Sequence, residues 1–216
     1  MAPKQQQRLR VVTLASTKGG TGKTTLSSAL AVRAAEESKR VALVDLDPQE
    51  SLASWWKRRG RTKNPKLFEV DATTEAIELL VSEGWEWVFI DTGPAKIDLI
   101  EPGIVVADLV LIPVRPSAFD IEQAAICVEL CETHGKPHAF VLNHAPAGTK
   151  LTKSSINFLQ QNGSTVIDAP ITFRSAYMAA ATVGKSGPEI EKNGVARREI
   201  DALWAAVLKL LPGKVT

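Results

Sequence analysis

Runs of apolar, mostly β-branched residues recur along the chain and are bounded by turn residues, at positions 10–16, 40–45, 87–91, 109–114 and 139–144. Within each run the apolar residues are continuous and do not alternate with polar ones, which is typical of strands buried on both faces of a parallel sheet. Segments of helical length lie between or after these runs, at residues 24–38, 73–83, 118–134 and 153–161. This order predicts a doubly wound α/β domain, with a mostly parallel central sheet flanked by helices.

The length and composition of the chain favour one domain of an ordinary globular class. With 216 residues, we expect residues 1–216 to form a single unit, with residues 1–8 as a flexible tail. Hydrophobic residues make up 44% and charged residues 23%, which excludes the disordered class. The first ten residues are polar and basic, and every apolar run is too short to span a bilayer. The sequence therefore predicts a cytoplasmic protein.

The charge of the chain is nearly balanced, with a formal net charge of +2. A nucleic-acid surface must therefore be local, because the whole molecule does not provide a strongly positive field. The segment 56–66, WKRRGRTKNPK, contains only positive charges among its ionisable residues. Two interpretations of this basic segment stay open, a solvated surface loop and a local nucleic-acid contact.

Two cysteines and two histidines are spaced loosely like a metal site, at Cys127, Cys131, His134 and His138. The cysteines, however, lie one helical turn apart in an apolar helix, and Gly135 and Pro137 end that helix between the histidines. Structural zinc sites usually pair close cysteine and histidine couples held by turns. The pattern favours ordinary core thiols over a metal site.

A glycine-rich segment, STKGGTGKTT at residues 16–25, follows the first predicted strand and opens the first predicted helix. Glycines let backbone N–H groups surround phosphate oxygens, and the helix directs its positive end toward them. Lys23 would neutralise phosphate charge, and the Thr24 hydroxyl would ligate Mg²⁺. The usual phosphate-loop pattern has a glycine where Thr17 stands, and this loop adds a second lysine, Lys18. The predicted nucleotide-binding residues of the loop are Lys18, Gly19, Gly20, Thr21, Gly22, Lys23, Thr24 and Thr25.

Carboxylates follow two of the predicted strands. Asp45 and Asp47 come at and after the end of the second strand, and Asp91 ends the third. Ligands of parallel sheets collect at the carboxyl ends of the strands, so we expect these acids near the glycine-rich segment. For Asp45 and Asp47 a polar turn after a strand is the alternative interpretation.

Four motifs in this order resemble one family. KGGTGKTT at 18–25, VALVDLDPQ at 41–49, WVFIDTGP at 87–94 and ADLVLIPVRPSAFDIE at 107–122 are similar to the deviant Walker A ATPases of the ParA and MinD group. The likeness covers nearly the whole chain and suits the short ParA type, which lacks an N-terminal helix-turn-helix extension. It implies a P-loop fold, ATP and Mg²⁺ as cofactors, and slow hydrolysis of ATP to ADP and phosphate.

The resemblance also implies roles for single residues. Lys18 matches the signature lysine, which reaches the nucleotide of the opposite subunit in an ATP-bound homodimer. Asp47 matches the residue that positions the attacking water, so Lys18, Lys23 and Asp47 form the predicted catalytic set. Asp45 and Asp91 match residues that act on Mg²⁺ through water, beside the direct ligand Thr24.

Asn143, at the end of the fifth apolar run, falls where relatives place an asparagine against the adenine ring, and a strand-end turn residue is the alternative. Residues 171–189 resemble a C-terminal switch segment. Basic residues of the C-terminal region bind non-specific double-stranded DNA in relatives, and the candidates here are Lys185, Lys192, Arg197 and Arg198.

The function implied is an ATPase that positions plasmid, chromosome or protein cargo over the nucleoid, together with a ParB-like or other cargo adaptor. A MinD-like regulator at the membrane is the main alternative. An apolar stripe would support it, at Ile200, Leu203, Trp204, Val207, Leu208 and Leu211. The other side of that helix carries Asp201, Ala202, Ala205, Ala206 and Lys209, a poor surface for lipid headgroups, so we expect a helix docked on the body and no membrane contact. Metabolic use of ATP would need a substrate pocket or cluster cysteines near the phosphates, and neither cysteine lies in such a motif.

Overall fold

The structure of the protein is a computed structural model that describes residues 8–38 and 40–211. The tail expected at residues 1–8 lies outside the described residues apart from Arg8, whose guanidinium pairs with Asp108 at 2.6 Å. The described strands form one sheet: β1 (Arg10–Leu14), β2 (Val41–Asp45), β3 (Lys66–Phe68), β4 (Trp87–Asp91), β5 (Leu109–Val114), β6 (His138–Leu142) and β7 (Val166–Ile167). The sheet has seven strands in the order β3-β2-β4-β1-β5-β6-β7, and each pairing between them is parallel. The predicted α/β fold with a parallel sheet is confirmed.

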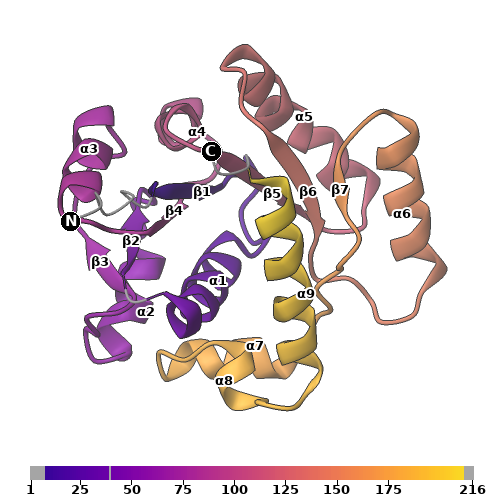
Figure 1. The fold of residues 1–216 in the computed structure, drawn as a ribbon. Helices are drawn as coiled ribbons and strands as arrows, with labels where there is room; N and C mark the ends of the chain where they lie inside the picture. The colour runs from indigo at the N-terminus through magenta and orange to yellow at the C-terminus, as the bar shows by residue number, and fades with distance from the viewer. Residues whose placement is uncertain (1–7, 39, 212–216) are drawn as a thin grey trace, which may run out of the picture.

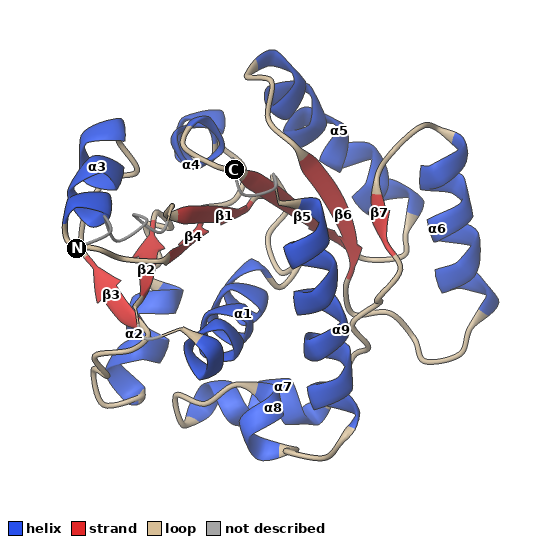
Figure 2. Ribbon diagram, viewed as in Figure 1, coloured by secondary structure: helices blue, strands red, loops and turns tan. Residues whose placement is uncertain are grey.

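Helices cover both faces of this sheet (Figures 1 and 2). They are α1 (Lys23–Glu37), α2 (Ser51–Arg58), α3 (Thr74–Ser82), a 3₁₀ turn η1 (Ile97–Leu99), α4 (Glu101–Val105), α5 (Ala118–Thr133), α6 (Lys150–Gln161), α7 (Ser175–Thr182), α8 (Gly187–Ile190) and α9 (Val195–Leu210). One layer holds α1, α2, α7, α8 and α9, and the other holds α3, α4, α5 and α6. Each layer buries the apolar side chains that the continuous strand pattern requires on both sheet faces.

The strand order places the loop after β1 at the middle of the sheet. β1 lies between β4 and β5, and the chain runs from β1 to one side for β2 and to the other side for β5 and β6. Crevices at such a reversal of strand order are where open α/β sheets bind ligands. The glycine-rich segment therefore sits at the position that the topology favours for a ligand.

The main differences from the sequence prediction are short or edge elements. β3 and β7 contain three and two residues, and each lies at one edge of the sheet. A strand this short cannot show a continuous apolar run, so its pattern does not identify it. The basic segment 56–66 is also less of a loop than expected, because α2 extends through Arg58 and β3 begins at Lys66.

The helix expected at the C-terminus packs on the body of the protein. Ile200, Leu203 and Val207 of α9 are fully buried, and the ring of Trp204 lies 4.6 Å from that of Trp87 in β4. Leu208 departs from the predicted stripe, because it is 41% exposed. Docking of this helix on the body is confirmed. Within the described residues, every helix is too short or too polar to cross a membrane.

Candidate functional site

The glycine-rich segment turns from β1 into α1 through two left-handed residues, Gly20 (φ 71°) and Gly22 (φ 91°). Gly22 precedes the first residue of α1, and a side chain there would overlap the amide of Asn143. Only glycine combines this backbone angle with so close a neighbour. The segment thereby brings its backbone against the residues that follow β6 and leaves the first turn of α1 to face the carboxyl end of the sheet.

Lys23 points into this loop. Its ammonium Nζ donates to the carbonyl oxygens of Ser16, at 3.2 Å, and Lys18, at 3.5 Å. The residue is only 6% exposed, and burial lowers the pKa of the ammonium, while the nearby carboxylates of Asp91 and Asp47 oppose that change. A cation held by main-chain oxygens of the loop is placed to bind the oxygens of a phosphate at the same position.

Lys18 points the other way, toward α5. Its Nζ lies 2.7 Å from Oδ2 of Asp120, and its side chain is 30% exposed. The Asp120 side chain is 4% exposed, and its second oxygen accepts from Nε of Arg115 at 3.1 Å. Burial would raise the pKa of Asp120, but the hydrogen bonds from Lys18 and Arg115 outweigh it and lower the pKa. The two lysines of the loop thus have different surroundings, one internal and one at the rim.

Asp91 lies at the centre of the site. It ends β4 beside Asp45, its register partner on β2, and it is fully buried. Its Oδ2 has no hydrogen-bond partner among residues 8–38 and 40–211, and Oδ1 lies 3.5 Å from the hydroxyl of Ser27. Burial raises the pKa of Asp91 to about 7, with a hydrogen bond from Thr24 opposing the rise. A buried carboxylate oxygen without a partner is costly in isolation and suits a nearby cation or its water shell.

The Thr24 hydroxyl and the Asp91 carboxylate suit a magnesium ion that takes most of its ligands from water and phosphate oxygens. Thr24 lies in the first turn of α1, and its hydroxyl opposes the rise in the pKa of Asp91, so a hydroxyl and a carboxylate lie together at the helix N-terminus. Residues 8–38 and 40–211 contain no cluster of three His, Cys, Asp or Glu arranged to hold a metal. Mg²⁺ typically binds through one or two protein groups plus water and phosphate oxygens, so the donors present suit it.

Asp45 and Asp47 both shape the turn that leads into α2. Asp45 accepts from the backbone N–H of Asp47 at 3.1 Å and of Ala53 at 2.9 Å, and Asp47 accepts from that of Gln49 at 2.9 Å. Burial raises the pKa of Asp45. The polar-turn interpretation therefore describes what both carboxylates do here, and their predicted roles toward metal and water stay predictions.

Asn143 is 2% exposed and supports the loop directly. Its Nδ2 donates to the carbonyl of Thr21 at 2.6 Å, so the adenine contact predicted for it stays a prediction. The following residue, His144, has a positive φ of 52°, and its ring packs edge-on against Phe173 at 5.5 Å. Sequence reasoning gave no role to His144, although its place just after a strand end was a usable signal.

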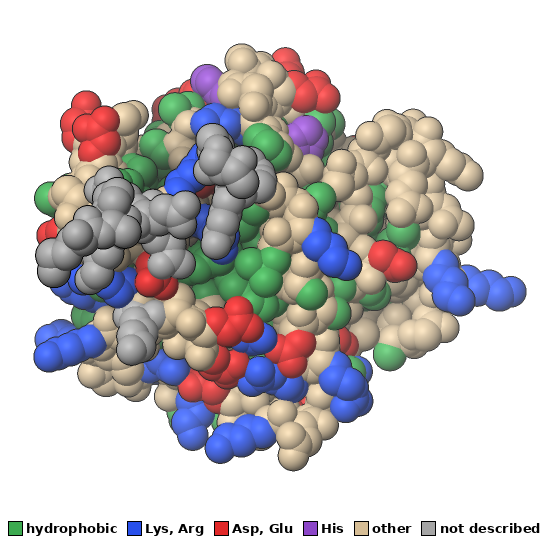
Figure 3. Space-filling view, in the orientation of Figure 1, with side chains coloured by type: hydrophobic (Ala, Val, Ile, Leu, Met, Phe, Trp, Pro, Cys, Tyr) green, Lys and Arg blue, Asp and Glu red, His purple; other side chains and the backbone are tan. Residues whose placement is uncertain are grey.

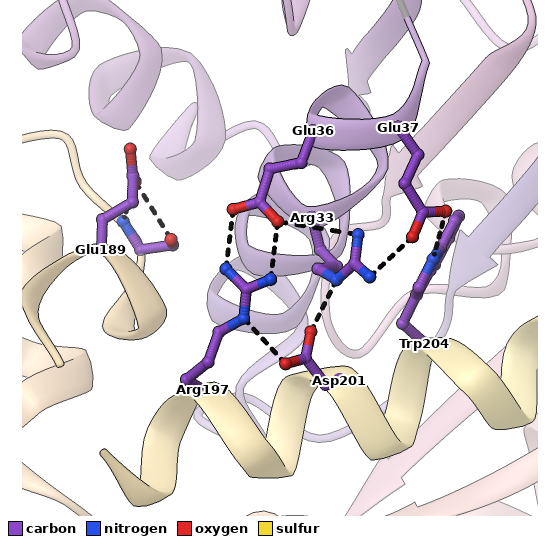
Figure 4. Close-up of polar contacts among 8 residues, drawn as sticks. Arg33, Glu36, Glu37, Glu189, Arg197, Asp201 and Trp204 are labelled. Atoms are coloured by element: carbon purple, nitrogen blue, oxygen red, sulfur yellow. Dashed lines mark hydrogen bonds and ion pairs between the residues drawn. The ribbon is translucent and has the colours of Figure 1, made fainter. Parts of the chain in front are cut away.

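The four C-terminal cations do not share one environment. Arg197 forms paired hydrogen bonds with Glu36 at 2.8 and 2.9 Å, and it also pairs with Asp201 at 2.8 Å. Figure 4 shows these contacts inside a network that joins α1 to α9 and also holds Arg33, Glu37 and Trp204. Lys185, Lys192 and Arg198 are exposed, and none of the three has a carboxylate within ion-pair distance among the described residues.

The cysteines behave as core residues. Cys127 and Cys131 are fully buried on α5, and burial raises their pKa values to about 11 and about 12. His134 instead pairs with Glu101, with 2.7 Å between Nε2 and Oε1, and Nδ1 of His138 lies 3.2 Å from the carbonyl of Lys136. Protonated thiols and separately engaged histidines agree with the interpretation of core thiols.

Two partners of the loop were missing from the sequence prediction. Asp120 and Arg115 flank the start of α5, just after β5, where Asp120 binds Lys18 and Arg115 binds Asp120. The carboxyl-end rule that selected Asp91 applies equally to the residues after β5 and could have identified them.

Comparison with known proteins agrees with the resemblance to the ParA and MinD group that the sequence motifs gave. Residues 12–186 match the family model described as the CobQ/CobB/MinD/ParA nucleotide binding domain. The chain is 30% identical to maintenance of carboxysome distribution protein A of Gloeobacter kilaueensis, over 94% of each chain. It is 28% identical to protein ParA of Rhizobium radiobacter, over 81% of this chain and 83% of that one. MinD of Pyrococcus horikoshii, solved with Mg-ADP, superposes with a TM-score of 0.76 at 16% identity, over 94% and 97% of the two chains.

Proposed function

The chain belongs to the CobQ/CobB/MinD/ParA family of nucleotide-binding domains, and from this membership we propose that it is a Mg²⁺-dependent ATPase that dimerises with ATP. The ATP-bound dimer binds DNA without regard to sequence and positions a plasmid, chromosome or protein cargo through a ParB-like or other adaptor. Its place is the cytoplasm, at the nucleoid. Relatives named for carboxysome distribution and for ParA support a positioning role over other uses of ATP.

The observation that carries the proposal is the separation of the two lysines. Lys23 lies inside its own loop, where its ammonium donates to the carbonyl of Ser16 and would neutralise the phosphates of a nucleotide held by that loop. Lys18 lies at the rim, with its ammonium directed away from that loop and toward Asp120. A lysine at the rim can exchange its ion pair with Asp120 for the nucleotide of a second copy, so nucleotide binding and dimerisation become one coupled equilibrium.

The chemistry follows from the inner groups. The loop amides and Lys23 would hold the phosphates, and Thr24 would bind Mg²⁺ directly, with Asp45 and Asp91 acting on it through water. The ion would neutralise charge on the phosphate oxygens. Asp47 holds the attacking water, and one weakly basic carboxylate gives slow turnover. Slow hydrolysis sets the lifetime of the dimer on DNA.

Dimerisation is tested by sedimentation velocity with Mg²⁺ and a slowly hydrolysed ATP analogue. We expect the wild type to shift from monomer to dimer and Lys18→Ala to bind the nucleotide yet remain monomeric. Lys153→Ala, an exposed lysine of α6, is the matched control and should dimerise normally. Equal dimerisation of Lys18→Ala and wild type would refute the role of Lys18 in trans.

DNA binding is tested by gel retardation of an arbitrary duplex at low salt. A dimer presents twice the phosphate contacts of a monomer on one body, so its second half binds at high effective concentration. We expect retardation with ATP and much less with ADP. Retardation that is equal with ATP, with ADP and without nucleotide would contradict binding through the dimer.

A further inference from the structure

Two basic segments that lie far apart in the sequence are adjacent in the structure. Nε of Arg58, at the end of α2, donates to the carbonyl of Ala181 in α7 at 3.0 Å. The indole of Trp55 donates to the carbonyl of Lys185 at 2.9 Å. Arg58 and Lys185 both line one cavity of about 160 Å³. The basic segment 56–66 and the C-terminal cation Lys185 therefore belong to one surface.

A glycine makes this approach possible. Gly184 has a φ of 65°, and a side chain on it would overlap the backbone of Arg58 and Arg59. Arg59 completes the junction, since its guanidinium binds the carbonyl of Gly184 at 3.1 Å and both carboxylate oxygens of Glu189 at 2.8 and 2.9 Å. The relative position of Arg58 and Lys185 is thus fixed by several independent contacts.

The cations of this surface differ in whether they are already neutralised. Arg59 is matched by Glu189, as Arg197 is matched by Glu36 and Asp201 across the α1–α9 network. Arg58 and Lys185 are exposed, and within the described part of the chain no carboxylate lies within 4.0 Å of their charged nitrogens. Lys and Arg side chains gather along the lower edge of the molecule in Figure 3, where α2, α7 and α8 lie in Figure 1. Unmatched charge here is available to an external anion.

The same surface is joined to the nucleotide site. The cavity that Arg58 and Lys185 line is also lined by Thr24 and Thr25 of the glycine-rich segment. At its other end α2 is held by Asp45, which accepts from the backbone N–H of Ala53 at 2.9 Å. This helix, only eight residues long, therefore connects Asp45 at the nucleotide site directly to Arg58 at the surface.

We propose that Arg58 and Lys185 form a contact surface for the phosphate backbone of duplex DNA, positioned through α2 by the nucleotide site. This inference rests on the proposed function and selects its DNA-contacting residues. The charge of Arg197 is neutralised within the protein, so we no longer expect Arg197 to contact DNA. Arg58 and Lys185 take its place, although they lie in two segments that are far apart in the sequence. Phosphate contacts of this kind give affinity without sequence preference and strong dependence on salt.

The test compares Arg58→Ala/Lys185→Ala with Lys150→Ala/Lys153→Ala, which removes the same charge from exposed positions on α6. Fluorescence anisotropy with a labelled arbitrary duplex is measured from low to moderate salt, with the ATP analogue and with ADP. We expect the first variant to bind ~10-fold or more weakly. The magnitude of its slope of log K against log salt should fall by about 0.9 for each phosphate that is no longer neutralised. The α6 control should match the wild type.

Dimerisation and thermal unfolding are measured on every variant, so that unfolding or a failure to dimerise is not mistaken for a direct effect on DNA binding. Lys185→Ala alone keeps the test decisive if removal of Arg58 unfolds the protein, because Lys185 holds Trp55 through its main chain only. Unchanged DNA binding by the Arg58 and Lys185 variants, or equal weakening in the α6 control, would overturn the proposal that Arg58 and Lys185 contact DNA. A wild type that retards no DNA in any nucleotide state would overturn the proposed function itself. Binding of the ATP form to anionic lipid vesicles in place of DNA would overturn both.

Discussion

Asp91 and Asp120 are both nearly inaccessible carboxylates at the carboxyl edge of the same sheet, yet their pKa values move in opposite directions. Asp91 is fully buried, one of its oxygens has no partner in the described part of the chain, and burial raises its pKa to about 7. Asp120 is 5% exposed, but Lys18 and Arg115 bind its two oxygens and its pKa is lowered. Burial alone therefore does not determine the charge state, because the direct cation partners decide it.

The difference separates the site into two parts. The inner part, with Lys23 and Asp91, is built around groups that lack full partners and are suited to a phosphate and a metal ion. The rim part, with Lys18 and Asp120, is internally satisfied and has to exchange an existing ion pair for any new one. We therefore expect the inner part to carry out ATP hydrolysis. We expect the rim part to control dimerisation.

The strongest test of this separation is Asp47→Ala, a change confined to the inner part. We expect hydrolysis to fall ~10²–10⁴-fold, the range for loss of a positioned base, because the water loses its carboxylate. ATP binding and dimerisation should remain, since the loop and Lys18 are intact. Single-turnover hydrolysis and sedimentation on the same sample measure both. Turnover at the wild-type rate would show that Asp47 has no role in hydrolysis and serves only in the turn, where it accepts a hydrogen bond from the backbone N–H of Gln49.

The second test is the pH dependence of stability in Asp91→Asn, measured by urea unfolding without nucleotide or Mg²⁺. Because the folded-state pKa of Asp91 is raised from 3.8 to about 7, the folded state holds its proton more tightly. The contribution of Asp91 to the free energy of unfolding is therefore highest at low pH and is lost as the pH rises toward about 7. Asn does not titrate, so the variant does not lose this stability. Its free energy of unfolding relative to wild type should therefore be ~2 kcal/mol higher at pH 8 than at pH 5.

If the difference in the free energy of unfolding between variant and wild type is the same at both pH values, Asp91 does not titrate between pH 5 and pH 8. Asp108→Asn provides a comparison at the opposite end of β1, where the carboxylate is paired with Arg8.

The smallest expected effect is at the rim. Asp120→Asn keeps the shape of the side chain and removes its charge, so Lys18 gives up less when it leaves for the nucleotide of a second copy. A partly exposed ion pair is worth up to ~1 kcal/mol, so we expect the ATP-bound dimer to tighten by ~3- to 5-fold. Sedimentation equilibrium measures this. A weaker dimer would instead mean that Asp120 holds Lys18 in its active position.

The fold class and the inner site follow from the sequence alone. Long apolar runs specify buried parallel strands, and residues 16–25 carry the glycines and the lysine of a phosphate-binding loop. Because these signals depend on neighbours within one segment, they can be read from the chain without its fold. The same holds for α9, where the apolar spacing matches the residues that the structure buries, with Leu208 as the exception.

The partners of the charged residues, in contrast, depend on how the chain folds. Lys18 and Asp120 are 102 positions apart, Arg197 and Glu36 are 161 apart, and Arg58 contacts Ala181 across 123 positions. Whether a cation is matched or available depends on which helix packs beside it, and no local pattern encodes that. Interaction energies between charges fall with distance in space and not in sequence, so the rim of the site and the basic surface form only when the chain is folded.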